Sequence, residues 1–385
     1  RREPFAGGQV FGDVGSYEKI AGRVVYAIDP ALRQNQSIVD LQHAPRNKAG
    51  LVEFHGDLVI LAPVDPRRGN GAILYDVNNR GNKLAIRFFN HGDGGNAANE
   101  PGDGFLMRQG FTIVWSGWDG ELLPAADRLR LYPPVAKENG RTITGLVRCE
   151  LVPLADTSRS LIVNWDNHGS YRPTSNGLKQ VTLTVRSKPE LPREPIPRDQ
   201  FTVHVTEIPD AHVSQLPKVE IELAGGLKAG QIYELIYEAQ DPLVHGVCFA
   251  GVRDLITALK HGDGAGNPFR STGVSPVGPG EISPARTAPH PQPLSPKGRG
   301  EFVFSRAHGF GVSQSGRFLR EFLHSGFNED EHCRKVFDGL IPHVSGSGLG
   351  SFNHRFAQPT RHCNQHDHHD YPADRFPFGY GTICD

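Results

Sequence analysis

The sequence lacks a long apolar run and a surplus of charge of one sign, and each absence excludes a class of protein. The longest clean apolar run spans residues 58–64, far short of the roughly 20 residues that cross a bilayer, so we expect no membrane span. Lys+Arg 41 against Asp+Glu 42 leaves a net charge of −1, which provides no global field to attract nucleic acid. A small-molecule substrate is the expectation.

Cysteine and methionine are also scarce. The cysteines are Cys149, Cys248, Cys333, Cys363 and Cys384. They are odd in number, widely spaced and without a CxxC pair, so neither a disulfide framework nor a cysteine metal site is predicted. The chain begins at Arg1 and its only methionine is Met107, so we expect that an N-terminal piece, such as a signal peptide, precedes it.

Glycine and proline, in contrast, are abundant. The 385 residues include Gly 45 and Pro 30, which predicts many turns and loops. A hydrophobic share of 37% with 22% charged residues excludes a wholly disordered chain. At roughly 150 residues per domain, the length allows two or three domains, or one large fold with insertions.

The first 120 residues predict a sheet covered by helices. Short apolar runs separated by Gly, Pro and Asn clusters predict strands over 23–28, 52–61, 72–77 and 111–115. The last two do not alternate and are rich in Ile, Leu and Val, as is typical of strands buried on both faces. Between them, 90–104 is a polar, Gly-rich loop, followed by a short helical turn that ends at Gly110.

The rest of the chain divides into four further parts. Period-two alternation over 121–235 predicts an antiparallel β module. Within 236–260, residues 247–260 form one apolar helical stripe, which predicts a core helix. The proline- and glycine-rich stretch 261–303 is too poor in large apolar side chains to pack, so we interpret it as a disordered insertion or a ligand segment for a partner. Residues 304–385 return to alternating strand and helix patterns.

The motif that points to chemistry lies at residues 311–316. A short apolar strand, a tight turn at Ser313 and a helix opening at Ser315 or Gly316 form the context of a nucleophile elbow. Ser315 stands where this motif usually has its second glycine, a mild departure because serine is small. If Ser313 is the nucleophile, the backbone N–H of Gln314 and the helix N-terminus face the developing oxyanion. Ser315 is a poorer nucleophile, since Arg317 then occupies a position that must be small.

A competing hypothesis is a nucleotide-binding turn. Its glycines are Gly309, Gly311 and Gly316, and Asp338 stands about 22 residues further on, as a ribose-binding acid does. However, Gln314 fills the place of the third glycine of that fingerprint. A short G-x-S-x-S string also occurs by chance, so both alternatives stay open on this motif alone.

Longer segments resemble a known family. The strings "GFGVSQSGRFLREFLHSGFNEDE", "KVFDGLIPHVSGSGLGSFNHRFAQP", "QGFTIVWSGWDG" and "YEAQDPLVHGVCFAGVRDLITALK" resemble the bacterial "alpha/beta hydrolase domain" proteins, a serine hydrolase family within the α/β-hydrolase superfamily. The resemblance implies an α/β fold: a mostly parallel sheet with helices on both faces and an inserted antiparallel β module. It also implies a carboxylic ester substrate and no cofactor.

The resemblance assigns roles to four residues. Ser313 matches the nucleophile, with the N–H of Gln314 as the first oxyanion donor. The turn after strand 72–77 occupies the place of the second donor, so a backbone N–H near Asn79 or Arg80 is implied. The alternative is that Asn79 and Arg80 only form a strand-ending turn. Trp115 and Trp118 are expected to pack or to line the pocket.

The acid and base of a triad are not located. The superfamily order is Ser, then Asp or Glu, then His, and the resemblance places the last two beyond Asp385, so we expect a chain cut short at its C-terminus. His366, His368 and His369 in the tail are an alternative base or a metal cluster, with a solvated loop as the plain interpretation. A second hypothesis is therefore a catalytically incomplete fragment or binding scaffold.

The sequence leaves oligomeric state and compartment open. Relatives often have export signals, which favours a periplasmic or secreted location over a cytoplasmic one without deciding between them.

Overall fold

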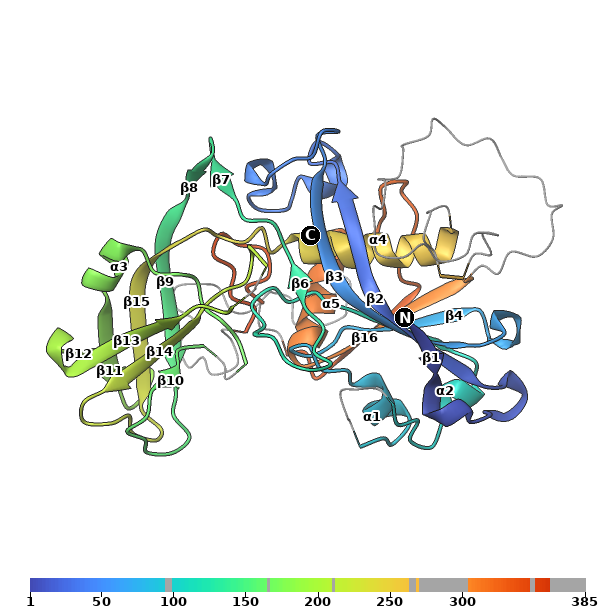
Figure 1. Cartoon of the computed structure of the whole chain (residues 1–385), viewed down its shortest axis with the longest axis horizontal. Coiled ribbons are helices and arrows are strands. Elements are labelled where there is room, and N and C mark those ends of the chain that lie inside the picture. Colours follow the sequence, from blue (N-terminus) through green and yellow to red (C-terminus); the bar gives the residue numbers. More distant parts are fainter. Residues whose placement is uncertain are drawn as a thin grey trace, which may run out of the picture.

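The computed structural model describes residues 1–93, 99–164, 167–209, 212–262, 268–269, 304–346 and 350–360. These residues form two lobes that lie side by side (Figure 1). Most of the predicted insertion 261–303, the middle of the loop 90–104 and the three tail histidines lie outside the described residues.

The first lobe is built on an eight-stranded mixed sheet with the order β1-β2-β3-β5-β4-β16-β17, in which β6 also pairs with β3. The strands are β1 (Arg2–Pro4), β2 (Tyr17–Ile28), β3 (Val52–Pro63), β4 (Ala72–Asp76), β5 (Thr112–Ser116), β6 (Leu131–Tyr132), β16 (Arg306–Val312) and β17 (Gly339–His343). Strands β5, β4, β16 and β17 are parallel neighbours. Strands β1, β2, β3 and β5 pair antiparallel in that order, and β6 is antiparallel to β3. The sequence-predicted strands are all present, and two are longer than expected because β2 and β3 pair along their whole length.

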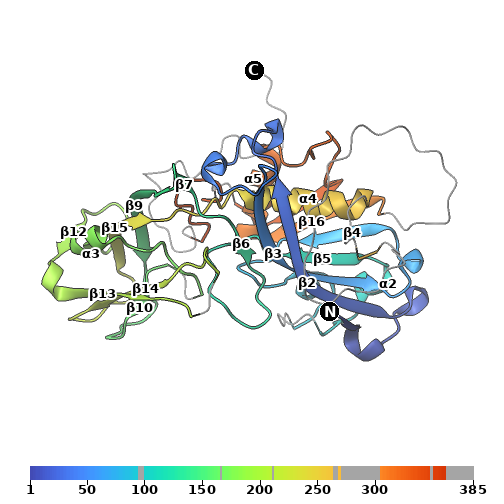
Figure 2. The same cartoon turned by 45° about the horizontal axis from the view of Figure 1, so that its top comes forward.

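Helices cover both faces of this sheet, as the unbroken apolar strands predict. On one face, α4 (Val247–His261) and α5 (Gln314–His324) pack in one hydrophobic cluster with Ile73 and Tyr75 of β4. On the other face, the short helices α1 (Ala85–Phe89) and α2 (Phe105–Arg108) pack with Leu74 of the same strand. Figure 2 shows α4 running along one side of the sheet and α2 on the opposite side.

The second lobe consists of small antiparallel sheets around its own hydrophobic core. One sheet has the order β12-β11-β15-β9, another β10-β14-β13, and β7 pairs with β8. The elements are β7 (Lys137–Glu138), β8 (Arg141–Thr142), β9 (Thr144–Leu151), β10 (Leu161–Ile162), α3 (Ser175–Lys179), β11 (Thr182–Arg186), β12 (Glu194–Ile196), β13 (Phe201–Thr206), β14 (Lys218–Leu223) and β15 (Ile232–Gln240). Short 3-10 helices cover Phe5–Gly8, Gly12–Val14, Arg33–Asn35, Leu41–His43, Pro66–Arg68 and Arg198–Gln200.

Two boundaries differ from the sequence analysis. The stretch 131–132, expected in the β module, pairs instead with β3 of the first lobe. The boundary expected at residue 235 falls inside β15, because its pairing with β9 continues to Gln240. Alternation alone identifies a strand but not the sheet that it joins, since pairing partners are set by the tertiary fold.

Asp76, the last residue of β4, fixes the loop that leads to the candidate site. Its buried Oδ2 accepts hydrogen bonds from the backbone N–H groups of Leu84 and Ala85 at 2.7 Å each and from the indole N–H of Trp115 at 2.5 Å. Burial raises the pKa of Asp76 from 3.8 to about 6. The folded protein therefore holds a proton on this carboxyl more tightly than the unfolded chain does.

We expect Asp76→Asn to remove part of the pH dependence of stability. A raised folded-state pKa gives stability that is complete below pH 3.8 and declines as the pH rises through about 6, by up to about 3 kcal/mol. Asparagine can keep the three bonds through its amide oxygen without this titration. Urea unfolding of both proteins between pH 4 and 7 should show the variant gaining stability relative to the wild type as the pH rises. A difference that stays constant with pH would contradict the assignment.

Candidate active site

Ser313 lies on a sharp turn between β16 and α5, at the carboxyl end of the parallel strands. Its backbone has φ 56 and ψ −113, a conformation that costs a non-glycine residue roughly 1–3 kcal/mol and is concentrated at functional sites. The helix begins at Gln314, one residue earlier than expected. The predicted strand, turn and helix are therefore present around this serine.

Close backbone packing holds the turn in place. The N–H of Ser313 donates to the carbonyl of His343 on β17 at 2.9 Å, and the Ser313 carbonyl accepts from Arg317 at 2.9 Å. A Cβ on Gly311 would lie 2.4 Å from the Ser315 carbonyl oxygen, and one on Gly316 would lie 3.0 Å from the His343 carbonyl oxygen. The turn therefore requires glycine at 311 and leaves little room at 316.

Ser315, at the position where the motif usually has glycine, has a structural role. It is fully buried, and its hydroxyl donates to the carbonyl of Asn78 at 3.1 Å. The Ser313 hydroxyl, in contrast, belongs to an exposed residue and has no hydrogen-bond partner among the described residues. Ser313 is thus the serine that a substrate can reach.

The turn after β4 lies beside the turn at Ser313. Residues 79 and 82 exchange backbone hydrogen bonds of 2.8 and 2.9 Å, and Arg80 and Gly81 between them have φ values of 51 and 80. The side-chain amide of Asn79 donates to the carbonyl of Val312 at 2.8 Å, so it ties this turn to the residue before Ser313. That bond gives the Asn79 side chain a positioning role.

The N–H of Gln314 belongs to the first turn of α5, whose amides have no acceptor within the helix. The structure thus brings Ser313, Gln314, Asn79 and Arg80 into one neighbourhood.

Both tryptophans are packing residues in this structure. Trp115 and Trp118 are fully buried. The Trp118 indole N–H donates to the carbonyl of Asn78 at 2.6 Å, the same oxygen that accepts from Ser315. Because this carbonyl receives two donors, the start of the 78–82 segment is fixed against both the sheet and α5.

The nucleotide-binding alternative does not fit the placement of Asp338. This carboxylate accepts from the Lys260 ammonium and from the backbone N–H of Ala307, both at 3.0 Å. Ala307 lies at the start of β16, and six strand residues at ~3.3 Å each separate it from Ser313 by about 20 Å. An acid at the opposite end of the strand cannot bind the ribose of a nucleotide held at the N-terminus of α5.

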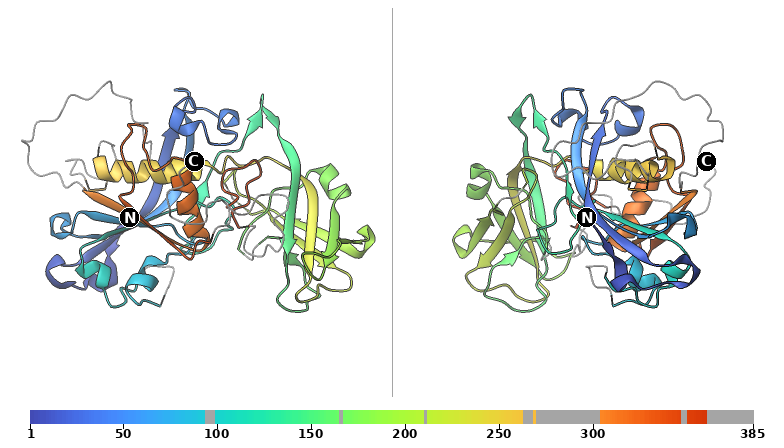
Figure 3. Two further views of the ribbon diagram at one scale, coloured as in Figure 1. Left: turned by 180° about the vertical axis from the view of Figure 1, so that it is seen from behind. Right: turned by 45° about the vertical axis from the view of Figure 1, so that its right-hand side comes forward.

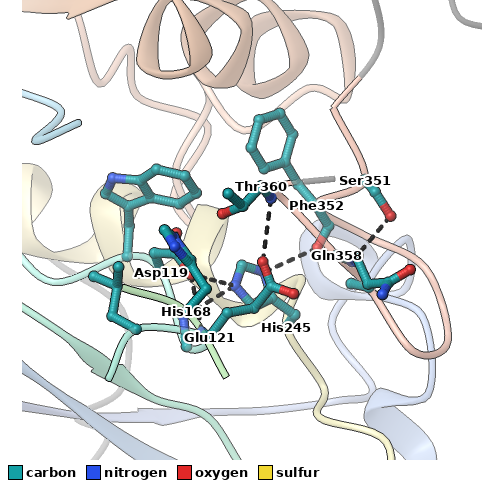
Figure 4. Close-up of polar contacts among 12 residues, drawn as sticks. Asp119, Glu121, His168, His245, Ser351, Phe352, Gln358 and Thr360 are labelled. Atoms are coloured by element: carbon teal, nitrogen blue, oxygen red, sulfur yellow. Dashed lines mark hydrogen bonds and ion pairs between the residues drawn. The ribbon is translucent and has the colours of Figure 1, made fainter. Parts of the chain in front are cut away.

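A second cluster of chemically active side chains, absent from the sequence analysis, lies where the two lobes meet (Figure 4). Its members are Asp119, Glu121, His168 and His245, all essentially inaccessible to solvent. The nearest His168 and Asp119 atoms, Nε2 and Oδ2, are 3.5 Å apart. Backbone pairing of residues 121–123 with 167–169 brings them together.

His245 contacts the backbone on both sides of its ring. Its Nε2 lies 3.1 Å from the backbone nitrogen of Gly120, and its Nδ1 lies 3.1 Å from the Phe352 carbonyl oxygen. Burial lowers the pKa of His168. Burial acts to raise the pKa of Asp119, but its histidine contacts outweigh burial and leave that pKa below its usual range.

Little in the sequence could have revealed this cluster. Asp119 lies three residues after the end of β5, and polar residues at the carboxyl ends of parallel strands are site candidates, but His168 stands in an irregular stretch. In the described part of the chain, no group of three or more His, Cys, Asp or Glu side chains is arranged to hold a metal ion. The helices described here include none long and apolar enough to span a bilayer.

Residues 286–377 match the family described as "Alpha/beta hydrolase domain". Of the described elements, this range contains β16, α5, β17 and the segment 350–360, and therefore Ser313. No curated protein and no solved structure matches the chain.

Proposed function

Because this chain belongs to the alpha/beta hydrolase domain family over residues 286–377, we propose that it is a serine hydrolase that cleaves carboxylic esters through an acyl-enzyme on Ser313. The observation that supports this most strongly is the strained backbone of an exposed serine at the start of a helix, φ 56 and ψ −113. Such strain persists only where the surrounding structure enforces it.

In this mechanism, the Ser313 hydroxyl oxygen forms a bond to the ester carbonyl carbon while its proton passes to a base. The carbonyl oxygen becomes an oxyanion, stabilised by the N–H of Gln314, by a backbone N–H near Arg80 and by the N-terminus of α5. Collapse of this intermediate breaks the bond to the alcohol, which leaves with a proton. Water then cleaves the acyl-enzyme by the same steps and regenerates the serine.

Among the described residues, no side chain forms a hydrogen bond with the Ser313 hydroxyl, so we assign no residue as the base. Two regions are candidates for shaping substrate access: the β module of the second lobe and the loop 90–104. Esters with acyl chains of different lengths would measure that contribution through KM.

A fluorophosphonate probe tests the proposal. The phosphorus takes the place of the ester carbonyl carbon, so we expect one covalent adduct per chain, located by peptide mass spectrometry on the peptide that contains Ser313. Heat-unfolded protein should not react, because the reactivity depends on the folded turn. An adduct on another residue, or none on the folded chain, would contradict the proposal and favour a catalytically incomplete scaffold.

A further inference from the structure

The segment 350–360 contacts both lobes and the helix of the elbow. The Arg355 guanidinium forms two hydrogen bonds with Asp40 of the first lobe, at 2.8 and 2.6 Å. The Tyr171 hydroxyl of the second lobe donates to the carbonyl of Ala357 at 2.9 Å. Figures 1 and 3 show this segment in red between the lobes. A movement of this segment would therefore change its contacts with both lobes and with α5.

Two buried side chains, those of His245 and Glu121, contact the backbone of the segment 350–360. His245 faces the carbonyl of Phe352 at 3.1 Å, and Glu121 Oε2 accepts the backbone N–H of Thr360 at 3.1 Å (Figure 4). Within the segment, the N–H of Gln358 donates to the Ser351 hydroxyl at 3.1 Å and closes a loop from residue 351 to residue 358. The Glu121 contact is the one that fixes the end nearest the elbow.

Thr360 in turn contacts the residue next to the nucleophile. The Gln314 side-chain nitrogen lies 3.5 Å from the Thr360 hydroxyl, a long hydrogen bond. Gln314 is fully buried, and its Oε1 has no partner among the described residues. Thr360 is thus the side-chain polar partner of Gln314 in the described part of the chain, and Glu121 fixes where Thr360 lies.

On the premise of the proposed hydrolase, we propose that Glu121 is a positioning residue of the elbow: by holding Thr360 it fixes Gln314, whose backbone N–H is the proposed oxyanion donor. A donor of this kind contributes about 10²–10³ in kcat, and a misplacement of about 1 Å can cost about 10². Loss of the Glu121 contact should therefore reduce the stabilisation of the oxyanion in the transition state and leave the binding of the ester substrate in the ground state unchanged.

The environment of Glu121 allows a sharp test. Burial and the neighbouring charge of Asp119 raise the pKa of Glu121 well above its usual range. Glutamine has the same shape and no charge, and its amide oxygen can accept from Thr360. A buried glutamate of the second lobe, Glu150, contacts Arg186 at 3.5 Å and is a matched control.

The experiment compares p-nitrophenyl butyrate kinetics and hydrogen exchange of the full chain and three variants. We expect Glu121→Ala to lower kcat about 10- to 100-fold with KM changed less than about twofold. Glu121→Gln and Glu150→Ala should stay within about threefold. Exchange in peptides covering 314–324 and 350–360 should accelerate in Glu121→Ala and not in Glu121→Gln.

Each other outcome overturns the inference. Equal losses of kcat in Glu121→Ala and Glu121→Gln would mean that the Glu121 carboxyl acts through its proton or its charge and not by holding Thr360. An equal loss in Glu150→Ala would mean general destabilisation. If the wild type neither turns over nor reacts with a fluorophosphonate, the proposed function fails. The exchange measurement then decides alone, and unchanged exchange in Glu121→Ala overturns the positioning role.

Discussion

Replacing Ser313 with alanine is expected to lower the turnover of p-nitrophenyl butyrate by about 10⁴- to 10⁶-fold, the scale seen when a serine nucleophile is removed. The Ser313 side chain is exposed and makes no hydrogen bond among the described residues, so its removal should leave the free energy of unfolding nearly unchanged. A large kinetic loss without a loss of stability distinguishes a nucleophile from a structural serine. The two quantities are measured by steady-state kinetics and by urea unfolding of the same preparations.

Ser315→Ala is the matched control, because it removes a hydroxyl two residues away. That hydroxyl is buried and donates to Asn78, so we expect a loss of about 1–2 kcal/mol of stability and turnover within about tenfold of the wild type. If Ser313→Ala kept its turnover and Ser315→Ala lost it, the choice between the two serines would be reversed. Background hydrolysis that is equal in all three proteins would favour the non-catalytic scaffold.

The local features of the site were predictable because each depends on a few adjacent residues. The strand, turn and helix around Ser313 follow from an apolar run that ends in small residues and from helical spacing after it. The covered sheet follows from strands 72–77 and 111–115, which have no polar face. In the structure, Leu74 and Tyr75 face opposite helical layers, which is the physical reason for the missing alternation.

The buried cluster could not be predicted from the same reasoning. Asp119 and His168 are far apart in the chain and meet because two irregular segments pair across the lobes. Thr360 reaches Glu121 over a still longer separation. Contacts of this kind depend on the tertiary arrangement, for which a single sequence contains no periodic signal. The hydrogen bonds from Asn79 to Val312 and from Ser315 to Asn78 could not be predicted for the same reason.

Adding a single methyl group near the elbow is expected to disrupt it most at Gly311, in the variant Gly311→Ala. The new Cβ would lie 2.4 Å from the carbonyl oxygen and 2.6 Å from the carbonyl carbon of Ser315, and both are backbone atoms that cannot rotate away. The turn cannot shift to make room, because the Ser313 N–H is bound to His343. We expect a loss of about 3 kcal/mol and of at least about 100-fold in turnover.

Gly22→Ala provides the comparison, since a Cβ at Gly22, on β2, would meet no atom within 4 Å. That variant should keep its turnover and gain up to about 1 kcal/mol of stability, because alanine reduces the freedom of the unfolded chain. The contrast isolates the close approach at the elbow from the general effect of removing a glycine. If Gly311→Ala kept both stability and turnover, the carbonyl of Ser315 would have to lie elsewhere, and the tight turn that presents Ser313 would no longer account for its reactivity.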